Sequence, residues 1–238
     1  MQIPRAGTLI DGAFLVDSFE FMMWEDGFRD FYMSRMLAWL RLRTGKVVMA
    51  VCCPGAALTY GTTFMDLLEE VPSGLDWIIP VICGNDFYSR GCIVPFDTAW
   101  EEAVERLCGA MKAKASAAFA VVGASAEVWR YDRFMPKEQQ ELFDLHAARL
   151  LAKFRLCGAG STSGASELTG LTIADDIGHV AVSSGWQVFH AYEAWVTLCC
   201  ELAVEETEAV SAVGGSPVCA YPVGLAVALA PGDLGAPL

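Results

Sequence analysis

The sequence predicts an α/β fold with three layers, α/β/α, built around a mainly parallel sheet of about five strands. Apolar runs of strand length alternate with longer segments in which apolar residues recur at helical spacing. The runs are apolar on both faces, which is typical of parallel strands covered by helices on two sides. A chain of 238 residues with 54% hydrophobic content can bury a sizeable core in such a domain.

Five apolar runs are the predicted strands, and the fifth has the weakest pattern. They are Ala13 to Val16, Val47 to Cys53, Trp77 to Cys83, Ala117 to Val122 and Leu168 to Ile173. Arg155 to Gly170 is rich in Gly, Ser and Thr, which indicates a surface loop.

The segments between the runs are predicted helices. The first has one apolar face at steps of three or four, formed by Phe21, Trp24, Phe28, Phe31, Tyr32, Met36, Trp39 and Leu40. The others are Leu58 to Val71, Thr98 to Lys114, Glu138 to Leu156 and a segment from about Ile177 through Trp195. In the fourth helix the expected buried stripe is Leu142, Leu145, Ala148 and Leu151 or Ala152.

The chain shows no linker that divides two folded units, so residues 1–205 are predicted to form one domain. Residues 206–238 are predicted to be a low-complexity tail, because the segment is low in charge and rich in Gly, Ala, Val and Pro.

Composition narrows the function classes. A net charge of -13 argues against nucleic acid as a partner, because phosphate binding needs clustered Lys and Arg. The nine cysteines include no C-x-x-C pair, so their spacing suggests neither a disulfide framework nor a zinc site. No signal peptide or membrane-spanning apolar stretch is visible, which predicts a cytoplasmic protein without a membrane span.

Polar residues follow four of the predicted strands. These strand ends are Asp17-Ser18, Pro54-Gly55-Ala56, Gly84-Asn85-Asp86 and, after the weak last run, Asp175 to His179. Parallel strands bind ligands at their carboxyl ends, so we expect these residues along one edge of the sheet.

In this order the four blocks resemble the SGNH, or GDSL-like, hydrolase family. That family has G-D-S, then a glycine after the second strand, then G-N-D or G-x-N-D, then D-x-x-H. Here the matching residues are Asp17-Ser18, Gly55, Gly84-Asn85-Asp86 and Asp176 with His179, and the likeness covers roughly residues 13–200. The resemblance implies a flavodoxin-like sheet and a serine acyl-ester hydrolase: an esterase, a lipase or a carbohydrate deacetylase.

By this resemblance, Ser18 attacks the carbonyl of a small-molecule ester, His179 takes its proton, and Asp176 holds the imidazole. The backbone N–H groups of Ser18 and Gly55 and the side-chain amide of Asn85 form the oxyanion hole. Losing one such donor costs roughly 3 kcal/mol, so we expect loss of Asn85 to slow the reaction about a hundredfold or more. The resemblance implies no cofactor and no metal.

The sequence departs from the family pattern at three places. Val16 stands where G-D-S has glycine, and we expect its β-branched side chain to crowd the strand end. Val180 follows His179 where many relatives have proline, and Phe19 with the apolar residues 21–24 fills the helix start. The helical spacing of these aromatics favours packing in the core over a substrate platform.

Each block also has a structural interpretation. Ser18, or Asp17 with Glu20, fits a helix cap, and Asp175 or Asp176 fits another. Pro54-Gly55 and Gly84-Asn85-Asp86 are common loop compositions. His146 and His190 fall within helical patterns and are assigned no role.

Two other function classes compete with the hydrolase. One is a binding or scaffold protein that keeps the hydrolase fold without turnover, which Val16 and the crowded helix start favour. The other is a nucleotide or flavin binder, but the segment after the first strand offers neither glycines nor a basic residue for phosphate.

Overall fold

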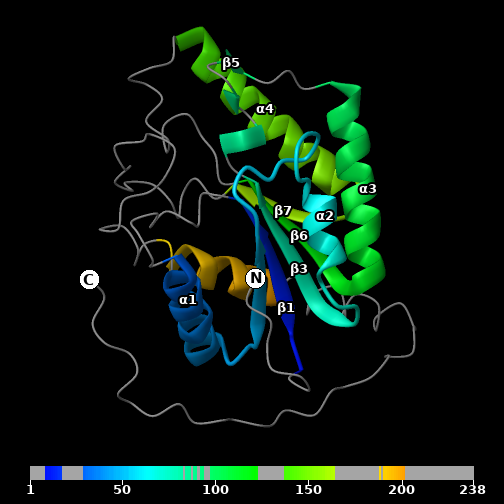
Figure 1. The fold of residues 1–238 in the computed structure, drawn as a ribbon. Coiled ribbons are helices and arrows are strands. Elements are labelled where there is room, and N and C mark those ends of the chain that lie inside the picture. The colour runs from blue at the N-terminus through cyan, green and yellow to red at the C-terminus, as the bar shows by residue number, and fades with distance from the viewer. Residues whose placement is uncertain are drawn as a thin grey trace.

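The structure of the protein is a computed structural model (Figure 1). It describes residues 9–17, 29–82, 84–86, 88–89, 92–93, 97–122, 137–163, 188 and 190–201. The predicted domain boundary at residue 205 and the tail at 206–238 lie outside these ranges.

A sheet of five parallel strands forms the centre of the fold. Its strands are β1 (Gly12–Val16), β2 (Val48–Cys52), β3 (Leu75–Ile82), β6 (Ala115–Val122) and β7 (Gly160–Ser163). They lie in the order β2-β1-β3-β6-β7, and every neighbouring pair is parallel. This is the flavodoxin-like order of a doubly wound sheet, so the predicted fold class is confirmed.

The last strand of this sheet lies where the sequence predicted a surface loop, so that prediction was wrong. β7 (Gly160–Ser163) lies inside the segment predicted to be a surface loop, and it pairs with β6. The predicted run Leu168 to Ile173 falls outside the described residues. β7 lies at the end of the strand order and is only partly buried, so its sequence GSTS needs no apolar face. Backbone pairing with β6, rather than an apolar pattern, defines it as a strand.

Helices cover the sheet on both sides (Figure 1). One face carries α1 (Arg29–Thr44) and the helix at 190–201, which are joined by an ion pair of 2.9 Å between Arg43 Nε and Glu193 Oε1. The other face carries α2 (Phe64–Glu69), α3 (Thr98–Lys114) and α4 (Lys137–Leu156). The predicted bounds of α3 are confirmed, and Asp97 caps its first turn.

The second helix begins later than predicted. The spacing predicts a helix from Leu58, but α2 starts at Phe64 because Thr63 is its N-cap and forms a capping box with Asp66. Residues 58–62 therefore form a loop.

The buried face of α4 also differs from the prediction. Leu142 and Leu145 are 40% and 47% exposed, so the predicted leucine stripe faces solvent over much of its length. The buried side chains are those of Phe143, His146, Ala147, Leu150 and Phe154. Both stripes have helical spacing, and the sheet buries the one that contains the two phenylalanines.

Two short elements follow β3. The 3-10 turn η2 (Gly84–Asp86) comes first, and the antiparallel pair β4 (Tyr88–Ser89) and β5 (Cys92–Ile93) comes next.

Aromatic side chains pack tightly where β1 meets β3. The Phe14 ring lies 5.3 Å from the Trp77 ring and 4.6 Å from the Tyr192 ring, measured between centroids. The Trp77 indole lies over Gly12, where an added Cβ would come within 2.2 Å of its ring carbons. Gly12 is therefore required by the close approach of this ring.

Replacing Gly12 with alanine should force Trp77 to move and lower the free energy of unfolding by about 2 kcal/mol. Urea unfolding of the variant and the wild type measures this loss. The matched control is Gly109→Ala in α3, where an added Cβ meets nothing within 4 Å. That change should stabilise the protein by about 0.5–1 kcal/mol, and equal stability of Gly12→Ala and the wild type would contradict this packing.

Candidate functional site

The candidate site lies at the carboxyl ends of β1, β2 and β3. β1 is the central strand of the three, and its last residue, Val16, pairs with Cys52 of β2 and Val81 of β3. The strand order reverses between β1 and β3, and this is where open parallel sheets bind ligands. The loops after these strands therefore meet at one edge.

Asn85 connects all three strand ends. It lies in η2, directly after β3, and its Nδ2 atom lies 3.2 Å from Asp17 Oδ2 and 3.2 Å from the Ala56 carbonyl oxygen. Asp17 follows β1, and Ala56 lies in the loop after β2. The two contacts account for both hydrogens of the Asn85 amide.

Gly55 occupies a tight turn beside Asn85. The Ala56 N–H donates to the Cys53 carbonyl at 3.0 Å, and Gly55 has a φ of +80°. Proline followed by a residue with positive φ is the pattern of a type II turn, which explains Pro54-Gly55. An added Cβ at Gly55 would meet nothing within 4 Å, so the backbone conformation requires glycine and the surrounding space is open.

Asp86 is a buried carboxyl to which the sequence analysis assigned no role. Its side chain is 0% exposed, and Oδ1 accepts the Leu58 N–H at 2.7 Å. Oδ2 has no hydrogen-bond partner among the described residues. Burial raises the pKa of Asp86 well above its ordinary value; the Leu58 hydrogen bond opposes this shift and the Asp17 charge adds to it. The sequence feature that could have identified Asp86 as a site residue is its position next to Asn85, just after an apolar strand.

Asp17 is also buried, at 1% exposed, and the Asn85 amide contacts its carboxylate. A buried carboxylate needs such donors, because burial without hydrogen bonds is costly. Asp17 and Asp86 thus place two carboxyls in different environments at one sheet edge.

The structure brings together some of the predicted site residues and leaves others outside its description. Gly55 and Asn85 lie at the same edge, as expected. Ser18, Asp176 and His179 lie outside the described residues, although Ser18 directly follows Asp17 in the chain. Val180 lies outside them as well.

Val16, which stands where the G-D-S pattern has glycine, is fully buried and belongs to the hydrophobic core. Its carbonyl accepts the Cys53 N–H at 3.1 Å, which ties the end of β1 to the loop after β2.

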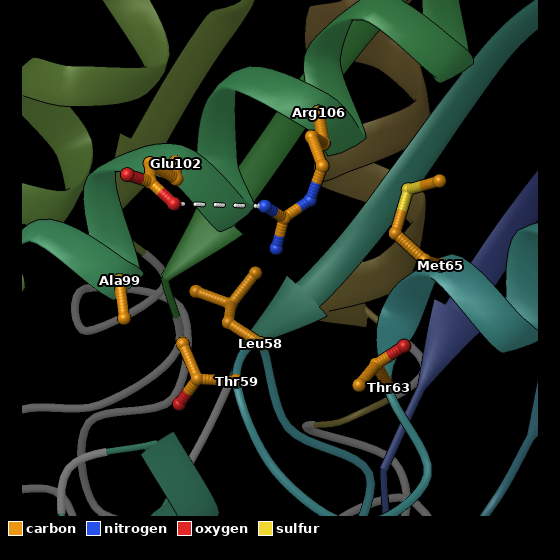
Figure 2. A pocket seen from close by; sticks show the side chains of 7 residues that line it. All are labelled: Leu58, Thr59, Thr63, Met65, Ala99, Glu102 and Arg106. Carbon is orange, nitrogen blue, oxygen red and sulfur yellow. Dashed lines mark ion pairs between the residues drawn. The ribbon is translucent and has the colours of Figure 1, made fainter.

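A pocket of about 300 Å³ lies beside this edge (Figure 2). The loop after β2, the start of α2 and the first turns of α3 line it, through Leu58, Thr59, Thr63, Met65, Ala99, Glu102 and Arg106. Figure 2 shows the Arg106 guanidinium directed toward Leu58. Arg106 Nη1 forms an ion pair with Glu102 Oε2 at 3.8 Å. Leu58 joins the pocket to the candidate site, because Asp86 accepts its N–H.

Within the described ranges, no group of three or more His, Cys, Asp or Glu side chains is arranged to hold a metal ion. Within the same ranges, no helix is long and apolar enough to cross a membrane.

Several solved structures share this fold, among them two hydrolases. An alpha/beta hydrolase enzyme from the metagenome of Lake Arreo matches with a TM-score of 0.53 at 13% identity, over 77% of this chain and 93% of that chain. An acetylxylan esterase from Geobacillus stearothermophilus matches with a TM-score of 0.51 at 13% identity, over 76% and 91%. A protein from Lactobacillus plantarum matches with a TM-score of 0.51 at 10% identity, over 79% and 96%.

At such identities the likeness shows a shared fold alone. No protein-family model matches the chain, and no curated protein matches its sequence significantly.

Replacing Asp86 with asparagine should make the protein relatively more stable as pH rises. A carboxyl whose pKa is raised by folding stabilises the protein fully below its unfolded pKa of about 4, and this contribution is lost as pH rises through the folded pKa. Asparagine keeps an oxygen for the Leu58 N–H and does not titrate. The free energy of unfolding of Asp86→Asn, minus that of the wild type, should therefore increase from about pH 4 toward neutrality in urea titrations.

Asp66→Asn is the control, because its stability relative to the wild type should change with pH in the opposite direction. Hydrogen bonds from the Thr63 backbone and side chain lower the pKa of Asp66, so its contribution is present above its unfolded pKa and is lost in acid. This variant should be less stable than the wild type at neutral pH, and the deficit should shrink below about pH 4. A pH-independent difference for Asp86→Asn would contradict a raised pKa of Asp86 in the folded protein.

Proposed function

We propose that the protein is a serine acyl-ester hydrolase with Ser18 as nucleophile, His179 as general base and Asp176 as the residue that orients His179. The observation that supports this most is the Asn85 amide. It lies beside the Gly55 turn and contacts Asp17, the residue directly before Ser18. The esterase-type hydrolase fold agrees with the proposal.

The proposed reaction has two steps. In the first, Ser18 Oγ bonds to the ester carbonyl carbon while His179 takes the hydroxyl proton, and the carbonyl oxygen becomes an oxyanion. Collapse of this intermediate breaks the bond to the alcohol oxygen, which leaves with the proton from His179. In the second step, water activated by His179 attacks the acyl-enzyme and releases the acid and Ser18.

The proposed oxyanion hole consists of the backbone N–H groups of Ser18 and Gly55 and the side-chain amide of Asn85. The positive φ of Gly55 and the open space around it leave room for a substrate at this turn. Both Asn85 amide hydrogens have partners in this structure, so one must leave the Ala56 carbonyl to reach the oxyanion. The contact with Asp17 would then keep the amide oriented.

We further propose that the substrate is an ester of a small hydroxylated alcohol, such as an acetylated carbohydrate. The pocket beside the site is lined by three apolar side chains, two threonines and a Glu-Arg pair, a combination that suits the hydroxyl groups of a sugar ring. One structural neighbour is an acetylxylan esterase. We propose a cytoplasmic location, since six cysteines are free thiols: Cys52, Cys53, Cys108, Cys157, Cys199 and Cys200.

The alternative function is a binding or scaffold protein on the same fold. The observation that favours it is the engagement of both Asn85 amide hydrogens by Asp17 and Ala56, which leaves neither directed at a substrate.

A fluorophosphonate probe separates the two functions. Attack by Ser18 Oγ on phosphorus would release fluoride and leave the probe on the protein, so the wild type should be labelled and Ser18→Ala should not. The matched control is Ser163→Ala, at the carboxyl end of β7 on the same sheet, which should keep the label. Absence of label from the wild type would favour the binding protein.

The pH dependence tests His179. If it is the base, kcat/KM for p-nitrophenyl acetate should rise through a histidine titration at about pH 6 to 7 and then level off. Stopped assays with subtraction of the uncatalysed rate measure this profile. A kcat/KM that does not change between about pH 5 and about pH 9 would contradict the assignment of His179 as the base. Loss of activity on adding a chelator would instead indicate a metal site at Asp176 and His179.

A further inference from the structure

The loop that follows the Gly55 turn is closed on itself. The Ala57 N–H donates to the Thr62 carbonyl, and the Phe64 N–H donates to the Ala57 carbonyl, both at 3.1 Å. Two backbone hydrogen bonds thus close the base of the loop between residues 57 and 62–64. The capping box of α2 follows directly. Such a loop presents its side chains from a fixed frame.

Two contacts run from this loop to consecutive residues of η2. The Leu58 N–H donates to Asp86 Oδ1 at 2.7 Å, and the Tyr60 hydroxyl donates to the Asn85 backbone carbonyl. Tyr60 is 38% exposed, so its ring lies at the surface of the edge rather than in the core. Asn85 is therefore contacted at its backbone by Tyr60 and at its amide by Asp17 and Ala56.

We propose that Tyr60 is a positioning residue for Asn85. The inference rests on the proposed function, in which the Asn85 amide turns from the Ala56 carbonyl toward the oxyanion. The Tyr60 hydroxyl holds the Asn85 carbonyl, and hence its backbone, in place while the side chain changes partner. Oxyanion donors act only when they are placed before charge develops, so a loosened Asn85 backbone would weaken the donor in the transition state.

Tyr60→Phe removes the hydroxyl and keeps the ring. We expect kcat for p-nitrophenyl acetate to fall about tenfold with KM changed less than about twofold, because the loss acts on transition-state charge. The matched control is Tyr192→Phe, which removes a hydroxyl from a fully buried tyrosine that packs on Phe14. Its kcat should equal that of the wild type.

A double substitution tests whether Tyr60 acts through Asn85. Asn85→Ala should lower kcat about a hundredfold, and adding Tyr60→Phe to it should lower kcat no further than about twofold. A full tenfold loss in the Asn85→Ala background, or an unchanged kcat for Tyr60→Phe alone, would overturn the proposal.

A measurement that needs no activity separates this inference from the proposed function. The ¹⁵N–¹H signals of the Asn85 side-chain amide can be assigned by their loss in Asn85→Ala. They should shift or broaden in Tyr60→Phe and stay unchanged in Tyr192→Phe. If the wild type hydrolyses no ester, the hydrolase proposal fails and these signals still decide whether Tyr60 positions Asn85. Signals unaffected by Tyr60→Phe would overturn it.

Discussion

The Asn85 side-chain amide is the interaction on which the arrangement of the site depends. It projects from the end of β3 and contacts Asp17 after β1 and the Ala56 carbonyl after β2. These three loops are far apart in the chain and meet because β1 lies between β2 and β3 in the sheet. The amide donates to a nearly fully buried carboxylate, so removing it would leave the Asp17 charge with one donor fewer.

The two buried carboxyls at this edge of the sheet, those of Asp17 and Asp86, differ in their electrostatic environments. Asp17 accepts from Asn85, whereas Asp86 is fully buried and its pKa is raised by that burial and by the Asp17 charge. The raised pKa favours the protonated form of Asp86, in which the carboxyl can still accept the Leu58 N–H and anchor the loop that carries Tyr60. One charge at this edge is easier to satisfy with the available donors than two would be.

The fold and the site place different demands on the sequence. Solved hydrolases share the fold at 13% identity, which shows that the sheet order and its helical layers tolerate almost complete exchange of side chains. Function depends on the loops at the sheet edge, where single residues matter. The buried Val16 illustrates the difference: this residue, which stands where the G-D-S pattern has glycine, is part of the hydrophobic core.

The sequence by itself determined the α/β class, the parallel sheet and the bounds of α3, because runs that are apolar on both faces and apolar residues at helical spacing are local patterns. It also predicted that Gly55 and Asn85 lie at one edge of the sheet, since each follows an apolar run that predicts a strand. Only the tertiary structure decided that β7 is a strand, which face of α4 is buried, and that Asp17, Asp86 and Tyr60 surround Asn85. Those features depend on which strands are neighbours, and contacts between distant segments leave no periodic signal in the chain.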